Sequence, residues 1–187
     1  MIFEELTVTG AFLVKPERRA DERGHFARVW CQQEFGARGL VNRIEQINTG
    51  FSPKAGTLRG MHYQLPPHAE VKIAQCTRGA VFDVVVDLRQ GSPSYGQWAG
   101  VRLSPTEGSM LYVPEGCAHG YLTLEDDTEL VYMTSATYAP GSARGARHDD
   151  AAFAIDWPAA VRVISSADRN WPDHRPTDAV SLTETPQ

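Results

Sequence analysis

Turn signals interrupt this chain every ~8–12 residues from residue 52 onward, and the segments between them are typical of short strands. The segment Val81–Asp87 is rich in β-branched residues, and Thr128–Met133 alternates polar and apolar side chains as a half-buried strand does. Helix signals are scarce, and Gln32–Arg38 is the clearest of them. This rhythm predicts an all-β fold, an antiparallel sandwich or barrel with few short helices.

The chain has 187 residues, of which 42% are apolar, enough for one compact domain with a real core. We expect a single domain over residues 1–171. Within it, residues 1–30 mix short β segments with polar turns, so they form an arm that covers the barrel or pairs with the sheet edge of a second subunit. Residues 172–187 hold several prolines and no periodicity, which predicts a loose polar tail.

The net charge is −5, from 18 basic and 23 acidic residues, and no block of like charge occurs. This composition disfavours a nucleic-acid partner and an anionic membrane partner. The three cysteines are odd in number and form no CxxC pair, which is typical of a reducing compartment. No apolar run approaches ~18 residues and no signal peptide is visible, so we expect a cytoplasmic protein without a membrane span.

The segment 59–64 and the lysine that follows it carry the strongest chemical signal. Arg59, His62 and Lys72 place a guanidinium, an imidazole and an ammonium on neighbouring predicted strands. Two cations near one histidine favour its neutral form, which accepts a proton, and the pattern suits abstraction of a proton beside a carbonyl. A carboxylate behind the imidazole would fix its tautomer. The candidates for this role are Asp83, Asp87 and Asp168.

Residues 108–119 have the Gly-x5-Pro-x-Gly-x2-His spacing of the second cupin motif, which turns His119 inward. A metal-binding cupin supplies His-x-His and a Glu from its first motif. Here the pair is His62 and Gln64, and the nearest acid, Glu70, is misplaced. The ligand set for a divalent metal is incomplete, so we predict no metal site.

Two tyrosines follow in the second half of the chain. Tyr132 lies on a strand beyond His119, either as a core aromatic or as a general acid opposite His62. Tyr138 precedes a Pro-Gly turn, either as a packed loop residue or as a stacking platform for a nucleobase. The residues alone leave both choices open.

Taken in order, these segments resemble the dTDP-4-dehydrorhamnose 3,5-epimerase family and its sugar-nucleotide epimerase relatives, over about residues 3–171. The matching segments are 21–26, 46–48, 58–64, Lys72, 81–89, 92–98, 114–120, 131–132, Tyr138 and 166–168. The resemblance implies a metal-free jelly-roll cupin, a homodimer, and a nucleotide-diphosphate 4-keto-6-deoxysugar substrate. No cofactor is implied, because the reaction brings no net redox change.

The resemblance also implies roles for the reacting groups. His62 matches the family's base, with Asp168 or Asp83 as the carboxylate that orients it. Tyr132 matches the proton donor on the opposite face of the sugar, and Lys72 lies by the 4-keto oxygen. A fixed ammonium there stabilises the enolate that forms when the neighbouring carbon loses its proton.

Further residues are implied to bind the substrate. The diphosphate is assigned to Arg23 and Arg59, the nucleotide to Gln46 and Asn48, and the base to Tyr138, which stacks on it. The complete predicted set is Arg23, Phe26, Arg28, Gln46, Asn48, Arg59, Gln64, His119, which lines the sugar pocket, Tyr138 and Arg144.

Three departures from the family pattern concern recognition of the nucleotide or phosphates. Arg28 and Ala143, the latter followed by Arg144, stand where the family usually has a Glu, and the loop from Asn48 to Arg59 is longer than usual. Replacing a carboxylate with a guanidinium exchanges an acceptor for donors. The nucleotide therefore stays open between dTDP, GDP and CDP, and the sugar between a hexose and a heptose.

The leading prediction is epimerisation at C3 and C5 of a nucleotide-linked 4-keto sugar. A C3-only epimerase is the alternative within the class, because His62 serves either outcome. A metal-dependent cupin and a non-catalytic sugar-binding cupin are the alternatives outside it. The first is disfavoured by the incomplete ligand set, and the second needs no base and acid on opposite faces.

Overall fold

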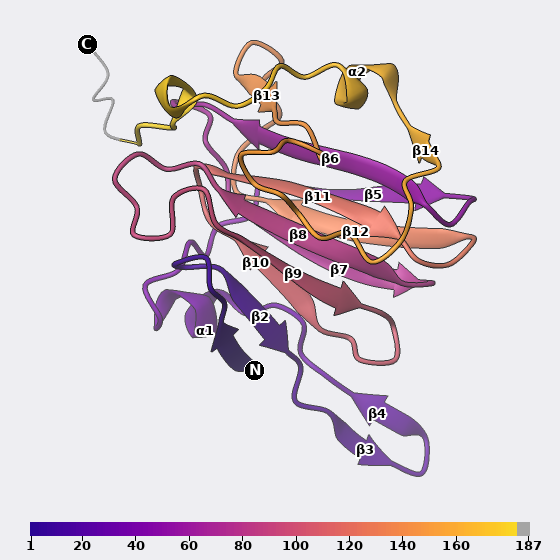
Figure 1. Ribbon diagram of the computed structural model, residues 1–187. Coiled ribbons are helices and arrows are strands. Elements are labelled where there is room, and N and C mark those ends of the chain that lie inside the picture. Colours follow the sequence, from indigo (N-terminus) through magenta and orange to yellow (C-terminus); the bar gives the residue numbers. More distant parts are fainter. Residues whose placement is uncertain (183–187) are drawn as a thin grey trace.

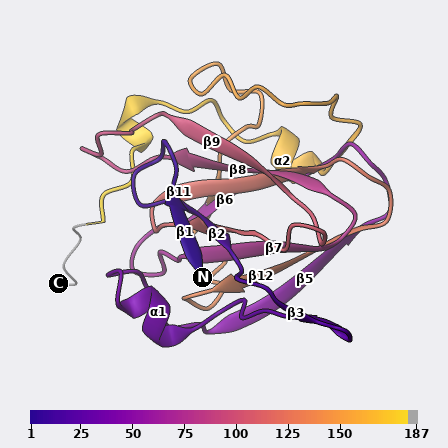
Figure 2. The same ribbon diagram turned by 90° about the horizontal axis from the view of Figure 1, so that it is seen from below.

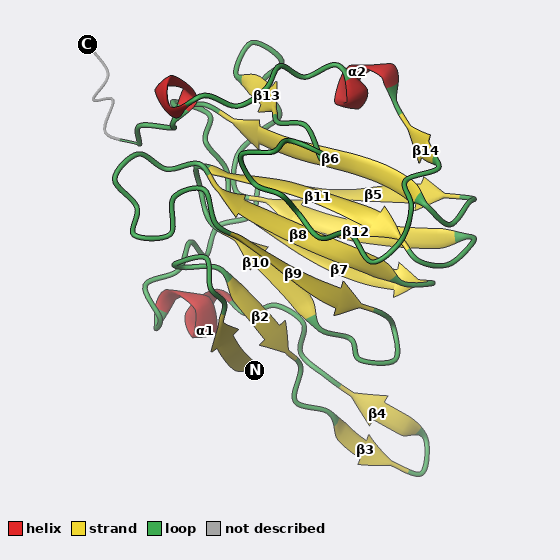
Figure 3. Cartoon of the chain, in the orientation of Figure 1, coloured by secondary structure: helices red, strands yellow, loops and turns green. Residues whose placement is uncertain are grey.

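The computed structural model describes residues 1–182, and strands dominate it (Figure 3). One six-stranded sheet has the order β1-β2-β10-β7-β12-β5. Its strands are β1 (Ile2–Glu5), β2 (Phe12–Lys15), β10 (Met110–Val113), β7 (Lys72–Arg78), β12 (Thr128–Thr134) and β5 (Gln46–Ser52). All its pairings are antiparallel. We call it the first sheet.

The second sheet faces the first and has the order β13-β6-β11-β8-β9. Its strands are β13 (Ala143–Gly145), β6 (Thr57–Gln64), β11 (Cys117–Thr123), β8 (Val81–Asp87) and β9 (Trp98–Leu103), and β14 (Val163–Ile164) adds to β6 in parallel. The remaining elements are the hairpin β3 (Arg19–Asp21) and β4 (Gly24–Phe26), helices α1 (Gln32–Gly36) and α2 (Ser166–Arg169), and the 3-10 helix η1 (Pro176–Asp178). Figure 1 shows the strands stacked in two layers.

The all-β, jelly-roll prediction is confirmed. The predicted strand Val81–Asp87 is β8, and the predicted strand Thr128–Met133 is β12 with one further residue. The predicted helix Gln32–Arg38 is α1, which ends at Gly36. The segment Thr128–Met133 alternates because β12 turns one face toward the core. Strand β8 is buried on both faces, so its sequence signal is a β-branched composition.

The main core lies between the two sheets and holds buried side chains from both, including Ala74 and Leu130 of the first sheet and Val81 and Val85 of the second. A second cluster covers the outer face of the second sheet, where Phe153 and Val180 pack on strand residues. A third lies under α1, centred on Phe35. Both sheets are therefore covered on part of their outer faces.

Residues 146–182 run over the outer face of the second sheet and reach its edge (Figures 1 and 2). Along this path, α2 lies against β6. The last described residues of the predicted tail then return to the end of β8. Val180 is 2% exposed, and its N–H donates to the Leu88 carbonyl at 2.7 Å. The predicted tail thus contacts the end of β8 through Val180, whereas most of residues 172–182 are exposed. Residues 183–187 of the predicted tail lie outside the described residues.

The β3–β4 hairpin differs from the rest of the arm. It extends away from both sheets (Figure 1), and every residue of its two strands is exposed. The strands β1 and β2, by contrast, belong to the first sheet and contribute Val14 to the buried cluster under α1.

Candidate active site

Strand β6 contains an irregularity that brings Arg59 and His62 to one face. A regular strand places residues three apart on opposite faces. In the pairing of β6 with β11, His119 lies opposite His62 while Tyr121 lies opposite Arg59, so β6 has one extra residue in this stretch. Such an extra residue is a β-bulge, and it re-aims the side chains beside it. The bulge, which the residue spacing alone does not predict, makes the shared face possible.

Gly60 explains why the bulge forms at this point. Its φ of +139° lies in a region that side chains other than glycine rarely adopt. A Cβ added there would collide with the Gly120 backbone of β11. The Arg59 guanidinium beside it turns toward β5, where it donates to the Phe51 carbonyl at 3.0 Å and to the Ser52 hydroxyl at 3.3 Å.

His62 forms an ion-pair-type contact with a carboxylate from far along the chain. Its Nε2 lies 2.7 Å from Oδ1 of Asp168, on the short helix α2, while 46% of the His62 side chain stays exposed. The Ser165 hydroxyl, which accepts the Asp168 N–H at 3.0 Å, begins α2, and the Gly60 N–H approaches Asp168 Oδ2 at 3.4 Å. Burial raises the pKa of Asp168, but its bonds to His62 and Gly60 outweigh this and hold the pKa below its ordinary value.

The ammonium of Lys72 lies beside this pair. Lys72 begins β7 and is 9% exposed, and its Nζ donates to the His62 carbonyl at 3.1 Å. The same Nζ lies 3.1 Å from Oε1 of Glu70, whose side chain is 8% exposed. A base and a fixed cation are therefore neighbours, as the sequence predicts.

Tyr132 approaches from the opposite wall. It lies on β12 of the first sheet, between Asn48 of β5 and Ala74 of β7, whereas His62 lies on the second sheet. Burial, and then the negative charge of Glu70, raise the pKa of Tyr132 above its ordinary value, against the opposing effect of Arg59. The phenol is thus held in its protonated form at neutral pH.

A second histidine–carboxylate pair lies beside the first. His119 Nε2 is 2.6 Å from Asp83 Oδ1 on the neighbouring strand β8, and the His119 side chain is 8% exposed. Asp83 is fully buried, and its Oδ2 has no hydrogen-bond partner among residues 1–182. Asp83, one of the three candidates for orienting His62, is instead the partner of His119.

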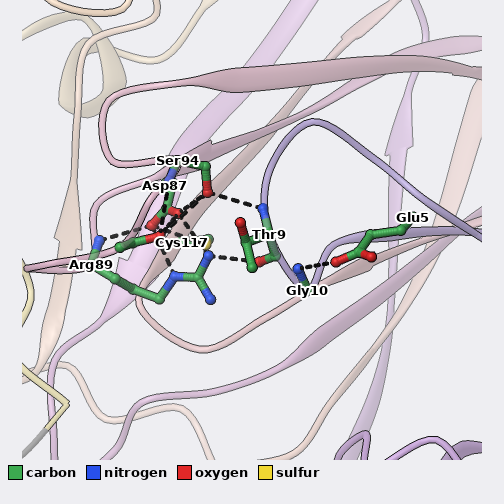
Figure 4. A network of polar contacts seen from close by, with 8 residues as sticks. Glu5, Thr9, Gly10, Asp87, Arg89, Ser94 and Cys117 are labelled. Carbon is green, nitrogen blue, oxygen red and sulfur yellow. Dashed lines mark hydrogen bonds and ion pairs between the residues drawn. The ribbon is translucent and has the colours of Figure 1, made fainter.

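The third candidate carboxylate, Asp87, is engaged elsewhere. Figure 4 shows it in a polar network with Arg89, Ser94 and the N-terminal segment at Thr9. Its oxygens accept bonds from the Arg89 guanidinium at 2.7 and 2.8 Å and from the hydroxyls of Ser92 and Ser94 at 2.6 Å. Burial raises the pKa of Asp87, but these bonds lower it to about 2. The network closes one end of the sandwich, and only Asp168 remains to orient His62.

The loop after β12 is held by two glutamines. The Gln46 Oε1 atom accepts the Tyr138 N–H at 2.9 Å, and the Gln64 Oε1 atom accepts the Ala139 N–H at 2.6 Å. Between these bonds the Tyr138 side chain is 62% exposed. Gln64 itself is 3% exposed, so its amide is used within the protein. Asn48, by contrast, lies next to Tyr132 on the inner face of β5.

Other predicted substrate-binding residues lie apart from this group in the single chain. Arg23 pairs with Asp21 at 2.6 Å and Arg28 with Glu34 at 2.9 Å, both at exposed positions. Phe26 on the hairpin is 70% exposed. The contacts of these three with a substrate stay predictions. The same holds for Arg144, which lies on β13 opposite Tyr63 of β6 and donates to the Ala143 and Gly141 carbonyls at 2.8 and 2.9 Å.

Glu70 is the residue that sequence reasoning missed. It appeared there only as a misplaced metal ligand, yet the structure places it between Lys72 and Gln64. The signal was present, because residues two apart in an extended segment share a face, and Glu70 precedes Lys72 by two.

Within residues 1–182, no group of three or more His, Cys, Asp or Glu side chains is arranged to hold a metal ion. Of the helices in that part of the chain, none is long and apolar enough to span a membrane.

Comparison with known proteins matches the family description dTDP-4-dehydrorhamnose 3,5-epimerase to residues 5–175. A dTDP-4-dehydrorhamnose 3,5-epimerase of Sinorhizobium fredii is 41% identical over 173 residues, covering 92% of this chain and 89% of that protein. A dTDP-4-dehydrorhamnose 3-epimerase of Streptomyces niveus is 39% identical over 171 residues, covering 91% and 82%.

The fold is matched as well. The crystal structure of dTDP-4-dehydrorhamnose 3,5-epimerase from Bacillus anthracis, with TDP and pyrophosphate bound, superposes with a TM-score of 0.88. It is 35% identical, and the match covers 92% of this chain and 99% of that one. Sequence and fold agree, and the chain belongs to the dTDP-4-dehydrorhamnose 3,5-epimerase family of isomerases.

Proposed function

We propose that this enzyme epimerises a nucleotide-diphosphate 4-keto-6-deoxysugar, of the dTDP-4-dehydro-6-deoxyglucose type, at C3 and C5. The observation that carries the proposal is the half-exposed His62–Asp168 pair, with the Lys72 ammonium 3.1 Å from the His62 carbonyl. Family membership supports the substrate class, as does the Bacillus anthracis relative solved with TDP. We assign the activity to the domain predicted over residues 1–171.

Proton abstraction is assigned to His62. With Nε2–H donated to Asp168, the Nδ1 atom is the ring nitrogen left to accept a proton, and it has no partner among the described residues. The base takes the proton of C3 or C5, and the electron pair of the broken C–H bond moves to the C4 oxygen as an enolate. Lys72, which is 9% exposed, stabilises that oxyanion.

Inversion requires that the proton return from the other face. Tyr132 stands on the opposite sheet with its phenol protonated, because burial and Glu70 raise its pKa. It donates to the carbon as the enolate collapses to the ketone. One proton leaves and one returns, so there is no net oxidation and no redox cofactor enters the mechanism.

The substrate's diphosphate and nucleotide extend from this centre. We assign Arg59, Asn48 and Gln46 to this end of the substrate, with Tyr138 as a platform on which the base stacks. Arg–diphosphate bonds provide binding energy away from the reacting carbon, which holds the sugar in a reactive pose.

We propose that two copies of the chain form a homodimer. Strand β5 ends the first sheet, and its outward side chains Ile47 and Phe51 are 67% and 47% exposed. Beside it lies a hollow of about 550 Å³ lined by residues that include Trp30 and Met133. A second copy covers these groups and brings its β3–β4 hairpin, with Arg23 and Phe26, toward the neighbouring site. Sedimentation equilibrium tests this, with twice the 20.6 kDa chain mass expected and a monomer mass against it.

A C3-only epimerase is the second candidate. The observation in its favour is the 39% identity to the 3-epimerase of Streptomyces niveus, close to the 41% identity to the 3,5-epimerase of Sinorhizobium fredii. Identity at this level does not separate the two outcomes, because the same base serves both carbons.

Proton NMR in deuterium oxide tests the proposal. Incubation with dTDP-4-dehydro-6-deoxyglucose is expected to replace the hydrogens at C3 and C5 with deuterium. Exchange at C3 alone selects the C3-only enzyme, and no exchange at either carbon rejects the proposal. The same assay with GDP- and CDP-linked 4-keto sugars decides which nucleotide Arg28 and Arg144 tolerate.

A further inference from the structure

A continuous line of polar contacts joins the reacting end of the site to the exposed loop at Tyr138. It starts at the Lys72 ammonium, which touches the His62 carbonyl. It passes through the two oxygens of Glu70 and the amide of Gln64. It ends at the backbone of residues 137–139.

Glu70 is the centre of this line. Its Oε1 lies 3.1 Å from Lys72 Nζ, and its Oε2 accepts from Gln64 Nε2 at 3.2 Å. Both Glu70 and Lys72 have side chains that are about nine-tenths buried, at 8% and 11% exposed. Buried charges are retained only when they are paired and hydrogen-bonded, so each of these bonds fixes the position of the groups that share it.

Gln64 fixes the loop on the other side. Its Nε2 is shared between the carbonyls of His68 at 2.9 Å and Thr137 at 3.3 Å and the Glu70 carboxylate. Its Oε1 accepts the Ala139 N–H at 2.6 Å. With the bond from the Tyr138 N–H to Gln46 Oε1, three successive residues of the loop are held by side-chain amides. Glu70 adds to the bonds that set the orientation of Gln64, because only the NH2 end of the amide can face a carboxylate.

We propose that Glu70 is a positioning residue that couples the loop carrying Tyr138 to the ammonium of Lys72. This inference rests on the proposed function, in which Tyr138 meets the nucleotide and Lys72 meets the keto oxygen. Through Glu70, a nucleotide that orders the loop also fixes the ammonium where negative charge develops. Binding energy at the non-reacting end of the substrate is thereby used at the reacting end.

The first test is Glu70→Gln, which keeps the side-chain shape. A glutamine has one acceptor oxygen, so it satisfies Lys72 or Gln64 but not both. We expect kcat for the dTDP-linked 4-keto sugar to fall about ten-fold or more, and the dissociation constant of dTDP to rise about three-fold, as for a lost charge-assisted bond. The matched control is Glu4→Gln, which makes the same change in the exposed Glu4–Lys15 pair, whose ion pair measures 2.6 Å. This control is expected to keep kcat unchanged.

The second test is a double-mutant cycle of Glu70→Gln with Tyr138→Ala. Coupling predicts that the loss of kcat/KM in the double variant is smaller than the product of the single losses by about five-fold or more. Losses that multiply to within about two-fold overturn the proposal. If Glu70 has only a structural role, Glu70→Gln lowers the melting temperature, and the ratio between the product of the single losses and the loss in the double variant stays near one.

Should Glu70→Gln fail to fold, Tyr138→Ala decides the matter alone, because its side chain is 62% exposed. Coupling predicts that it lowers kcat at saturating substrate as well as raising KM, and a change in KM alone overturns the proposal. Failure of the proposed function is distinguishable, since the parent enzyme would then show no exchange. An active parent with Glu70→Gln within two-fold of its kcat rejects only the coupling.

Discussion

Two histidine–carboxylate pairs lie side by side in this enzyme. They share the same chemical groups but differ in exposure and in the origin of the carboxylate. His62 and His119 face each other across β6 and β11, and each ring nitrogen meets a carboxylate, at 2.7 and 2.6 Å. The His62 side chain is 46% exposed, whereas that of His119 is 8% exposed. The first has access to a substrate, and the second is largely enclosed.

The origin of the carboxylates differs as well. Asp83 comes from the strand next to His119 and is fully buried, with one oxygen unpartnered among the described residues. Asp168 comes from a helix 106 residues beyond His62 and keeps a lowered pKa through its bonds. Because Asp168 belongs to a helix outside the sheet, its carboxylate can pair with His62 while the imidazole stays partly exposed. We infer that the first pair performs proton transfer and that the second organises the wall beside it.

The largest expected contrast is between Asp168→Asn and Asp83→Asn. An amide behind His62 no longer selects the tautomer that accepts a proton, so kcat is expected to fall about 10³-fold. The same change behind His119 is expected to lower kcat by about ten-fold at most, since we assign no proton transfer to His119. Steady-state kinetics of both variants measure this, and equal losses would remove the distinction between the pairs.

For the free energy of unfolding, we expect the reverse order: the loss at Asp83 exceeds the loss at Asp168. Asp83→Ala leaves the His119 Nε2 atom buried and unpaired, which is expected to lower the free energy of unfolding by about 3 kcal/mol. Asp168→Ala leaves a half-exposed imidazole that water can reach, with an expected loss of about 1 kcal/mol. Urea denaturation gives both values, and a larger loss for Asp168→Ala would contradict the assignment.

The comparison extends to the tyrosines of the two walls. Tyr132→Phe removes the proposed donor, and epimer formation is expected to fall about 10²-fold. Tyr121, whose pKa is raised to about 12 mainly by burial, lies on β11 close to Gly50. Tyr121→Phe is the control, with kcat expected within about three-fold of the parent. A parent-like rate for Tyr132→Phe would assign the donor elsewhere.

An effect on stability alone is expected at Asp87, the carboxylate that pairs with neither histidine. Its folded-state pKa of about 2 lies below the ordinary value of 3.8, so its bonds stabilise the fold above pH 4 and this contribution is lost as the pH falls toward 2. Asp87→Asn is expected to lower the free energy of unfolding at pH 7 by about 2 kcal/mol and to flatten the loss of stability between pH 4 and 2. Urea titrations across this range check it, and an unchanged acid dependence would count against the Asp87 network.

Much of the fold was predictable because the signal is local. The β-branched composition of Val81–Asp87 and the alternation in Thr128–Met133 each predicted a strand, and these strands are β8 and β12. The neighbourhood of His62 and Lys72 also followed from the sequence. Their shared face with Arg59 did not, because it depends on a bulge that is readable only from the pairing of β6 with β11.

The carboxylate that pairs with His62 could not be predicted from the sequence, for a different reason. Three aspartates were chemically equivalent candidates, and the choice depends on where α2 lands on the second sheet. Within the predicted tail, Val180 is buried beside Leu88, a contact that no local pattern predicts. Arg23, Phe26 and Arg28 stay predictions, because within one chain they do not reach the His62 group.

The assignment of proton abstraction to His62 is tested most directly by deuterium exchange in two alanine variants, each assayed at saturating dTDP-4-dehydro-6-deoxyglucose. His62→Ala is expected to lose exchange at C3 by about 10³-fold or more, and His119→Ala to retain it within about ten-fold of the parent with a raised KM. Exchange by His62→Ala at a rate near that of the parent, or its loss in His119→Ala alone, would contradict the account.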